Sequence, residues 1–578
     1  MDPTYDTLYK EIILMSTALK GTAVGIAASS TNSSLAEIVQ AFATLLTVTT
    51  PSDSTAANVV AVTGTIAPDT LSTIVIARNR GAQPVDLSPA SIRERAQDED
   101  VISKLMGSIG QGNPEFQVHL HDVVTFIERL HIASAKDDNS SFHKIRTQFA
   151  VFIHCRALEK IIARMKNGEG MWKGGDPLAL LATRPVSKIA PVHFKLGMSQ
   201  TLEEILANRK LRKNSENLYT VATENAVKWL GVFLDLRSLL DQLIEGTKQV
   251  NSPRSGSGKK KRKQKVLSAN KADEFLWTIE ALFRIVECKA LVKALRSAYR
   301  DSEYFLSNSR PGVNEYAGKG DDFRESILEE DTYPSSGFTE LGIVHAFRYY
   351  RTFTAWTHAV KVVTNRITKF ARHNMEFHLA SPADFEFQPT VPQLTAEDVV
   401  KFMDEFSDVR EDSPFKKVSA NGDGFEKIVG DVHCEAQLMG FIDLKIRRGY
   451  GLTSKLSAML PDGPHDIPIG AGNKCCFMCH RLALRLAQTG RTSFVLPGTH
   501  GVIYGWAPPP HLEADIIKSL HSELHKLFKN RFPKNDIPSH NSSPASVAST
   551  TLAEDPPFLR LATQRSEYEE TEADLEEY

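Results

Sequence analysis

Four of the six cysteines of this chain lie close together in the sequence, and two of them form a C-x-x-C pair. The pair is Cys476 and Cys479, at the start of a segment whose apolar periodicity predicts a helix. Residues three positions apart share a helix face, so the two sulfur atoms can converge on one ion. The N-terminus of a helix also favours thiolate over thiol, and thiolate is the form that binds metals. The spacing therefore predicts a metal site.

Two thiolates do not complete a tetrahedral zinc site. A structural site recruits two further protein ligands, whereas a catalytic site takes one more and leaves the fourth position to water. The candidate third ligand is His433, which Glu435 follows by two residues. Inside a helix these two side chains would point about 200° apart, but in a first turn capped by Asp431 both can approach one ion. We expect His433 to bind Zn²⁺ and Glu435 to contact the water of the metal without ligating.

This arrangement suits the hydrolysis of an amidine-type C–N bond. Zinc lowers the pKa of its water from about 15.7 towards about 7, which creates a nucleophile at neutral pH. Attack on the amino-bearing carbon of a nucleobase also needs a group that carries protons to the ring nitrogen and to the departing ammonia. A carboxylate whose pKa is raised by a dry pocket can do both. Zinc deaminases combine a His/Cys/Cys site with a non-ligating Glu in an H-x-E…P-C-x-x-C signature.

Two blocks of the sequence, VHCEAQL (432–438) and IPIGAGNKCCFMCHRL (467–482), resemble the signature blocks of the cytidine-deaminase-like superfamily. The closer resemblance is to a predicted deaminase group common in fungal genomes, in which a large helical region precedes the deaminase domain. A third block of that group is matched by Gly498-Thr499-His500-Gly501 with Trp506 nearby. The resemblance covers only this part of the chain, and it implies a zinc-dependent deaminase acting on a nucleobase, nucleotide or nucleic acid.

By that resemblance, the metal ligands are His433, Cys476 and Cys479, and Glu435 is the proton shuttle. His500 and Trp506 are candidates for the substrate side, where the indole offers a stacking face for a base. The alternative for these two residues is a role in packing or in a turn.

The sequence departs from the superfamily pattern at two positions. Cys475 stands where proline usually precedes the first ligand cysteine, and Cys434 occupies the middle of the H-x-E block. Neither change removes a ligand, but Cys475 is an alternative metal ligand that competes with Cys476. If the site is instead closed and structural, His480 and His500 are the candidates for its fourth ligand.

The elements that must position these residues fall into two regions. Residues 1–375 are mainly helical, with strand-like segments only between about 57 and 80, and they form a scaffold that can bind protein partners. Periodic apolar positions predict helices over 115–131, 141–166, 200–211, 216–248, 271–300 and 338–372.

Residues 376–530 contain shorter elements and form the predicted zinc-binding, deaminase-like domain. Asn421-Gly422 predicts a hairpin, and short strands are expected at 467–472, 493–498 and 502–506. Helices are expected behind Asp431 and from an Asn473 cap to a Gly490 stop. The predicted fold class is therefore α + α/β, a mostly helical region followed by a cytidine-deaminase-like α/β domain.

Two further segments are expected to be flexible. Residues 251–268 combine a Ser/Gly/Pro linker with a basic run, Lys259 to Lys263, which is either a nuclear-import or phosphate-contacting signal or a solvated loop between two helices. Residues 535–578 are rich in Ser, Thr and Pro and end in acidic residues, which predicts a disordered tail.

The overall composition is that of an ordinary soluble protein. The 578 residues are 42% hydrophobic and 24% charged, and their formal net charge is −2, so no global field attracts nucleic acid or membranes. The acidic N-terminus argues against a secretory signal, and Lys20 interrupts the apolar stretch from Ile12 too early for a membrane span. We expect an intracellular protein, cytoplasmic or nuclear, with no membrane partner.

Three functional hypotheses follow from these observations. The first is a zinc-dependent deaminase that uses Glu435. The second is a catalytically inactive deaminase-like zinc fold that serves as a structural or interaction module. The third is a nucleic-acid-associated protein in which the basic loop around Lys261 makes the contacts and the zinc domain is ancillary.

Overall fold

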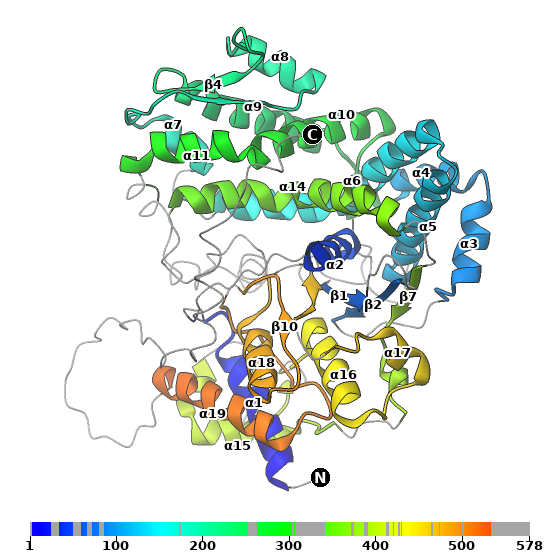
Figure 1. Ribbon diagram of the computed structural model, residues 1–578. Helices are drawn as coiled ribbons and strands as arrows, with labels where there is room; N and C mark the ends of the chain where they lie inside the picture. Colours follow the sequence, from blue (N-terminus) through cyan, green and yellow to red (C-terminus); the bar gives the residue numbers. More distant parts are fainter. Residues whose placement is uncertain are drawn as a thin grey trace, which may run out of the picture.

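The computed structural model shows a helical layer stacked on a smaller layer built around a mixed sheet (Figure 1). The described residues are 3–22, 24, 34–49, 59–65, 72–79, 86–170, 172, 175–251, 263–302, 306, 342–370, 375–386, 391–411 and 415–532, except 420, 426–427, 429, 464–465, 473 and 500. Helices far outnumber strands within these ranges, so the mostly helical composition expected from the sequence is confirmed.

The central sheet brings together strands that are far apart in the sequence. Its order is β7 (Met375–Leu379), β2 (Ser72–Arg78), β1 (Val60–Thr65) and β9 (Gly470–Ala471). Strand β1 is antiparallel to both β2 and β9, whereas β2 and β7 are parallel. A second, parallel pair joins β8 (Ile467–Pro468), which lies just before β9 in the chain, to β10 (Phe494–Val495), which follows it.

The sheet separates two hydrophobic cores, because successive side chains of a strand point to opposite faces. One face of β1 and β2 joins the core of the helical layer through Val60, Val62, Ile74 and Ile76. The other face joins the core of the lower layer through Ala61, Val75 and Ala77. A strand buried on both faces is apolar throughout, which explains why these two segments were recognisable in the sequence.

The expected division of the chain at residue 375 does not coincide with these layers. Strands β1 and β2 and helix α1 (Pro3–Ala18) pack with elements that follow residue 375. Helix α2 (Ser34–Leu46) lies between the sheet and the helical layer and contacts β1, β9 and α14 (Gly342–Phe370). Local apolar periodicity reports what each segment is, but not which distant segment it pairs with.

The helical layer is built on α5 (Phe116–Ala135), α6 (Asn139–Gly170), α9 (Ala226–Glu245), α10 (Ala269–Glu287) and α14. Its smaller elements are α3 (Pro89–Gln97), α4 (Val101–Ser108), α7 (Pro177–Ala182), α8 (Gln200–Asn208), α11 (Lys289–Ala298), β3 (Val192–Phe194), β4 (Tyr219–Val221), β5 (Lys248–Asn251) and β6 (Lys263–Val266).

The lower layer surrounds the other face of the sheet. Besides α1 it contains α15 (Ala396–Glu405), α16 (Cys434–Arg448), α17 (Ser454–Met459), α18 (Phe477–Gln488) and α19 (Ala514–Arg531). Helices α16 and α18 pack against each other, α16 also packs on β1 and β2, and α18 packs on α19. The two sequence blocks that suggested a metal site therefore begin neighbouring helices.

Two strand predictions in this layer need correction. The described residues around Asn421-Gly422 form turns and a short 3-10 helix, Phe415–Lys417, instead of a hairpin. The Ser419 N–H donates to the carbonyl of Asp423, so the chain closes a tight loop before strands can pair. The segment 502–506 does not form a strand: Val502 and Trp506 are single bridge residues, and Trp506 pairs with Asp431.

The two segments expected to be flexible lie mostly outside the described residues. These are 252–262 of the basic loop and 533–578 at the C-terminus. The flanks of the basic loop, β5 and β6, pair as an antiparallel hairpin. Among the described helices, none combines the length and apolarity that a bilayer crossing requires.

Candidate metal centre

The first block positions its residues at the start of α16. His433 is the N-cap residue, in an extended conformation (φ −68°, ψ 147°), and the helix runs from Cys434 to the left-handed Gly449. The predicted cap at Asp431 is wrong by two residues, because Asp431 is occupied in the bridge to Trp506. Since His433 stands before the helix and Glu435 is in its first turn, the two side chains are freed from the separation of a helix interior.

The second block positions Cys476 in the same way. Cys476 is the N-cap of α18, and its Sγ accepts a hydrogen bond from the backbone N–H of Cys479 at 3.3 Å. The predicted cap, Asn473, lies outside the described residues. The expected stop is confirmed by Gly490, which has a left-handed backbone (φ 70°) just past the helix. The thiol of Cys476 thus takes the position where a helix N-terminus best stabilises negative charge.

The ends of the two helices bring His433, Cys476 and Cys479 together. The Nδ1 atom of His433 lies 3.3 Å from the Sγ of Cys476 and 3.6 Å from the Sγ of Cys479. All three ligand atoms lie within 4.8 Å of one another. Among the residues the structure describes, this is the only group of three or more His, Cys, Asp or Glu side chains that meets this spacing.

The spacing fits a zinc ion. Zn–S bonds of about 2.3 Å and Zn–N bonds of about 2.0–2.1 Å at tetrahedral angles separate nitrogen from sulfur by about 3.6 Å and the two sulfur atoms by about 3.8 Å. The two measured nitrogen–sulfur distances, 3.3 and 3.6 Å, are close to the first value. One imidazole and two thiolates also form a donor set of the kind that zinc prefers.

Without a metal, the electrostatics of the group favour a thiolate at Cys476 beside a protonated imidazole at His433. Burial disfavours the charged form of His433, but the adjacent Cys476 thiolate raises the pKa of the imidazole to about 9. Burial likewise opposes the Cys476 thiolate, but hydrogen bonds from Cys479 and the charge of His433 bring its pKa well below the usual value. The pKa of Cys479 is raised, by burial and by the thiolate beside it. A cation at this point would stabilise both sulfur atoms as thiolates.

Glu435 lies beside this group without belonging to it. Its side chain is 3% exposed, and its Oε2 atom is 4.0 Å from the Sγ of Cys479 and 3.4 Å from the Sγ of Cys434. Burial raises the pKa of the Glu435 carboxyl, and the neighbouring Cys476 thiolate raises it further. Glu435 is therefore a buried carboxyl group next to the three ligand atoms, with a pKa above its usual value even though the charge of His433 acts in the opposite direction.

The two additional cysteines have different surroundings from the ligands. Cys434 donates its thiol to Glu435, and burial raises its pKa well above the usual value. Cys475 is fully buried and forms an isolated bridge with Thr499, whose hydroxyl donates to the Cys475 carbonyl at 2.8 Å. The structure does not include Cys475 in the ligand group, so the expected competition with Cys476 has no support in this geometry.

The structure does not bring Trp506 to the ligand group. Its indole is fully buried in the core of the lower layer, and its backbone exchanges hydrogen bonds with the hydroxyl of Ser16 on α1. This is the packing role that we considered as the alternative. His500 lies outside the described residues, and His480 is absent from the ligand group.

Sequence reasoning missed Asn79, which follows β2. Its side-chain oxygen accepts a hydrogen bond from the backbone N–H of Cys434 at 2.7 Å, at the first residue of α16. It holds the first turn that carries His433 and Glu435. The only signal in the sequence is an asparagine that ends an apolar run, and nothing in that pattern indicates a partner so far along the chain.

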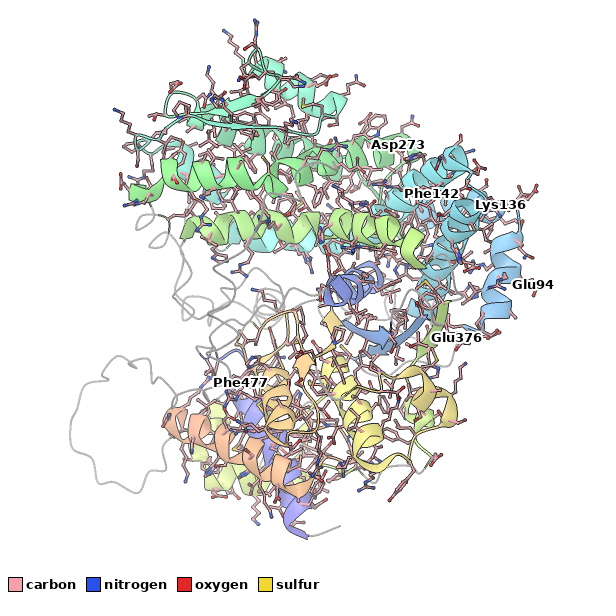
Figure 2. All side chains as sticks on the ribbon, viewed as in Figure 1. Glu94, Lys136, Phe142, Asp273, Glu376 and Phe477 are labelled. Carbon is pink, nitrogen blue, oxygen red and sulfur yellow. The ribbon has the colours of Figure 1, made fainter. Side chains whose placement is uncertain are left out.

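The residues at the group differ in their exposure. His433 and Asn79 are partly exposed, whereas both ligand cysteines and Glu435 are buried. Phe477, which is labelled in Figure 2, is the first residue of α18 and lies between the two ligand cysteines in the sequence. Its side chain is buried. A metal held by these three residues would therefore lie next to the buried core of the lower layer, to which both ligand cysteines belong.

Comparison with known proteins identifies no relative, because no family model, curated protein or solved structure matches this chain.

Proposed function

We propose that this protein is a zinc-dependent deaminase, which hydrolyses an amidine-type C–N bond of a nucleobase, nucleotide or nucleic acid. The observation that carries the proposal is the position of Glu435, buried next to His433, Cys476 and Cys479 but outside the ligand group. A carboxyl that only filled space in the core would be an expensive choice, because burying it unpaired raises its free energy by several kcal/mol.

The number of ligands supports a catalytic site over a closed structural one. Among the residues that the structure describes, the group contains three protein ligand atoms, which is the number that catalytic zinc sites take, whereas structural sites take four. His480, a candidate fourth ligand, is outside the group even though it follows Cys479 directly. Its backbone N–H donates to the Cys476 carbonyl as part of α18.

The residues divide the chemistry between them. Zinc, when bound, would lower the pKa of a water molecule so that it can act as a nucleophile at neutral pH. His433, Cys476 and Cys479 would hold the ion. Glu435, whose pKa is raised mainly by burial, would accept one proton from the attacking water and deliver it to the ring nitrogen. It would then take the second proton from the added hydroxyl and deliver it to the amino group, which leaves as ammonia. Asn79 fixes the helix turn from which two of these residues project.

The test compares the buried Glu435 with Glu280, which is partly buried. Glu435→Gln removes the proton-transfer group and preserves size, and Glu280→Gln makes the same change on α10, where burial also raises the pKa. Ammonia release is screened over nucleosides, nucleotides and single-stranded oligonucleotides, and bound zinc is measured in each protein.

We expect zinc in all three proteins and ammonia from wild type and Glu280→Gln only, with a loss of at least about 100-fold in Glu435→Gln. Equal ammonia release from wild type and Glu435→Gln would contradict the role of Glu435. Zinc in all three proteins without ammonia from any would favour the inactive zinc fold.

A further inference from the structure

A side chain of the helical layer donates a hydrogen bond to the backbone segment that precedes the ligand cysteines. Arg164, on α6, donates from Nη2 to the carbonyl of Gly472 at 3.2 Å. Gly472 lies four residues before Cys476 and directly after β9. A side chain of the helical layer thus reaches across to the strand end from which the C-x-x-C segment departs.

Arg164 is fixed at its other contacts. It is 2% exposed, its Nη1 donates to the carbonyl of Thr352 at 2.6 Å, and its guanidinium lies 4.5 Å from the ring centre of Trp356. Both Thr352 and Trp356 belong to α14. Because a guanidinium is planar and its donors form a rigid fork, fixing one branch on α14 also fixes the direction of the other.

Helix α2 supports the same segment. Gln40 donates to the carbonyl of Ala471 at 2.6 Å and accepts from its N–H at 2.9 Å, so it pairs with β9 as a neighbouring strand would. Gly470 and Gly472 lie so close to α2 and to Thr47 that a Cβ atom at either position would collide with them. The close approach explains why this short strand is rich in glycine.

We infer that Arg164 is a positioning residue for the metal centre, which couples the helical layer to the C-x-x-C segment. The inference rests on the proposed function for the identity of the site. Arg164 contacts none of the three ligands and acts through the backbone of Gly472, which leads to Cys475 and Cys476. It gives the helical region a specific task, since α6 and α14 together determine where the first ligand cysteine stands.

Side chains that orient metal ligands through hydrogen bonds, without touching the metal, typically change metal affinity by about 10-fold to 100-fold when they are removed. We expect an effect near the lower end for Arg164, because Gln40 still holds Ala471 in its absence.

The experiment compares Arg164→Met, Arg164→Lys and the control Arg156→Met. Arg156 is on the same helix and is equally buried, but it bonds the hydroxyl of Ser108 at 2.9 Å within the helical layer. Two quantities are measured in the full chain: amide hydrogen exchange of residues 470–479 in metal-free protein, and Zn²⁺ affinity by competition with a chelator. Thermal unfolding of each variant gives the general loss of stability.

We expect Arg164→Met to accelerate exchange in 470–479 and to weaken Zn²⁺ binding by about tenfold. Arg164→Lys retains the charge but can reach only one carbonyl at a time, so its effects are smaller in the same direction. Arg156→Met lowers thermal stability without changing exchange in 470–479. If Arg164→Lys folds and leaves both exchange and affinity unchanged, or if Arg156→Met changes both equally, the inference is overturned.

The exchange measurement separates the two proposals. If wild type binds no Zn²⁺, the proposed function fails, while faster exchange of 470–479 in the Arg164 variants would still establish the positioning contact. If wild type binds Zn²⁺ and the Arg164 variants do not differ from it in exchange or affinity, only the positioning role fails.

Discussion

One histidine in each layer, the buried His154 and the partly exposed His433, shows how the surroundings of an imidazole differ between the two layers. In the helical layer, both ring nitrogens of His154 have hydrogen-bond partners. Nδ1 lies 2.7 Å from the carbonyl oxygen of Ala150, and Nε2 lies 2.9 Å from the hydroxyl of Thr357. Burial lowers the pKa of His154 to about 4, so the ring is neutral. At the candidate metal centre, burial acts in the same direction on His433, but the Cys476 thiolate overrides it and raises the pKa to about 9.

The difference lies in the partners. The polar groups of His154 meet neutral partners supplied by the fold, and the arrangement is complete without any ligand. His433 instead faces two sulfur atoms, with a buried carboxyl next to them, and these groups have in common that they bind or stabilise a cation. A buried thiolate is destabilising unless a positive charge accompanies it, and without a metal that charge is the protonated imidazole of His433. The comparison supports the proposal that this part of the lower layer holds a metal, which would take the place of that proton.

Removing the metal should cause the largest loss of stability at the candidate metal centre. Treatment with a strong chelator should lower the unfolding temperature, since a ligand present at about 1,000 times its Kd stabilises the folded state by about 4 kcal/mol. Cys479→Ser should already be destabilised and should not respond to chelator. Differential scanning calorimetry with and without chelator measures this, and an equal response of wild type and Cys479→Ser would contradict it.

Lowering the pH should destabilise the protein, because the neutral histidines of the helical layer take up protons when the chain unfolds. Burial lowers the pKa of His119 to about 3 and that of His154 to about 4, below the value of 6.5 for a free imidazole. Between these values the unfolded chain binds more protons than the folded chain, so stability is fully present above pH 6.5 and is lost as the pH falls. Each of these histidines should lower the free energy of unfolding by about 1.4 kcal/mol for every pH unit by which the solution is acidified within this interval.

Denaturant unfolding followed between pH 7 and pH 5 measures this slope, with His154→Leu as the variant that should flatten it. A stability that stays constant over this range, or a slope unchanged by the substitution, would show that these histidines do not fold in the neutral form.

Replacing Asn79 should test the backbone support of α16. Asn79→Ala leaves the Cys434 N–H without its acceptor, which costs about 1–2 kcal/mol when a buried donor loses its partner. We expect Zn²⁺ affinity to fall several-fold, because the turn carrying His433 loosens. Isothermal titration with Zn²⁺ measures the change, and Asn217→Ala, in an exposed loop, serves as the control. An unchanged Zn²⁺ affinity would show that the hydrogen bond from Cys434 to Asn79 does not help to position His433.

The smallest effect is expected at Cys475. It is as buried as the ligand cysteines but lies outside the ligand group, so Cys475→Ala should leave zinc content unchanged. Inductively coupled plasma analysis of the variant makes the comparison with Cys479→Ser direct. Loss of zinc from Cys475→Ala would show that the ligand set has been assigned to the wrong cysteine.

The sequence predicted the residues of the group better than it predicted their surroundings. The spacings within the H-x-E block and within the C-x-x-C pair are local, and helix geometry limits where such side chains can point. The structure brings His433, Cys476 and Cys479 together as expected, whereas the chemistry of the group stays a prediction. Asn79 and Arg164 act on the site across hundreds of residues, and no local pattern links them to it. The hairpin expected at Asn421-Gly422 failed for a related reason, since a turn signal does not ensure that the flanking segments have strand partners.

The central claim is that His433, Cys476 and Cys479 hold one zinc ion. The most direct test is elemental analysis of the purified chain together with Cys476→Ser, Cys479→Ser and the control Cys155→Ser, whose cysteine lies on α6. We predict about one zinc per chain in wild type and Cys155→Ser and a loss of zinc in the other two variants. Full zinc content in both Cys476→Ser and Cys479→Ser, or none in wild type purified without chelator and supplied with Zn²⁺, would contradict the account.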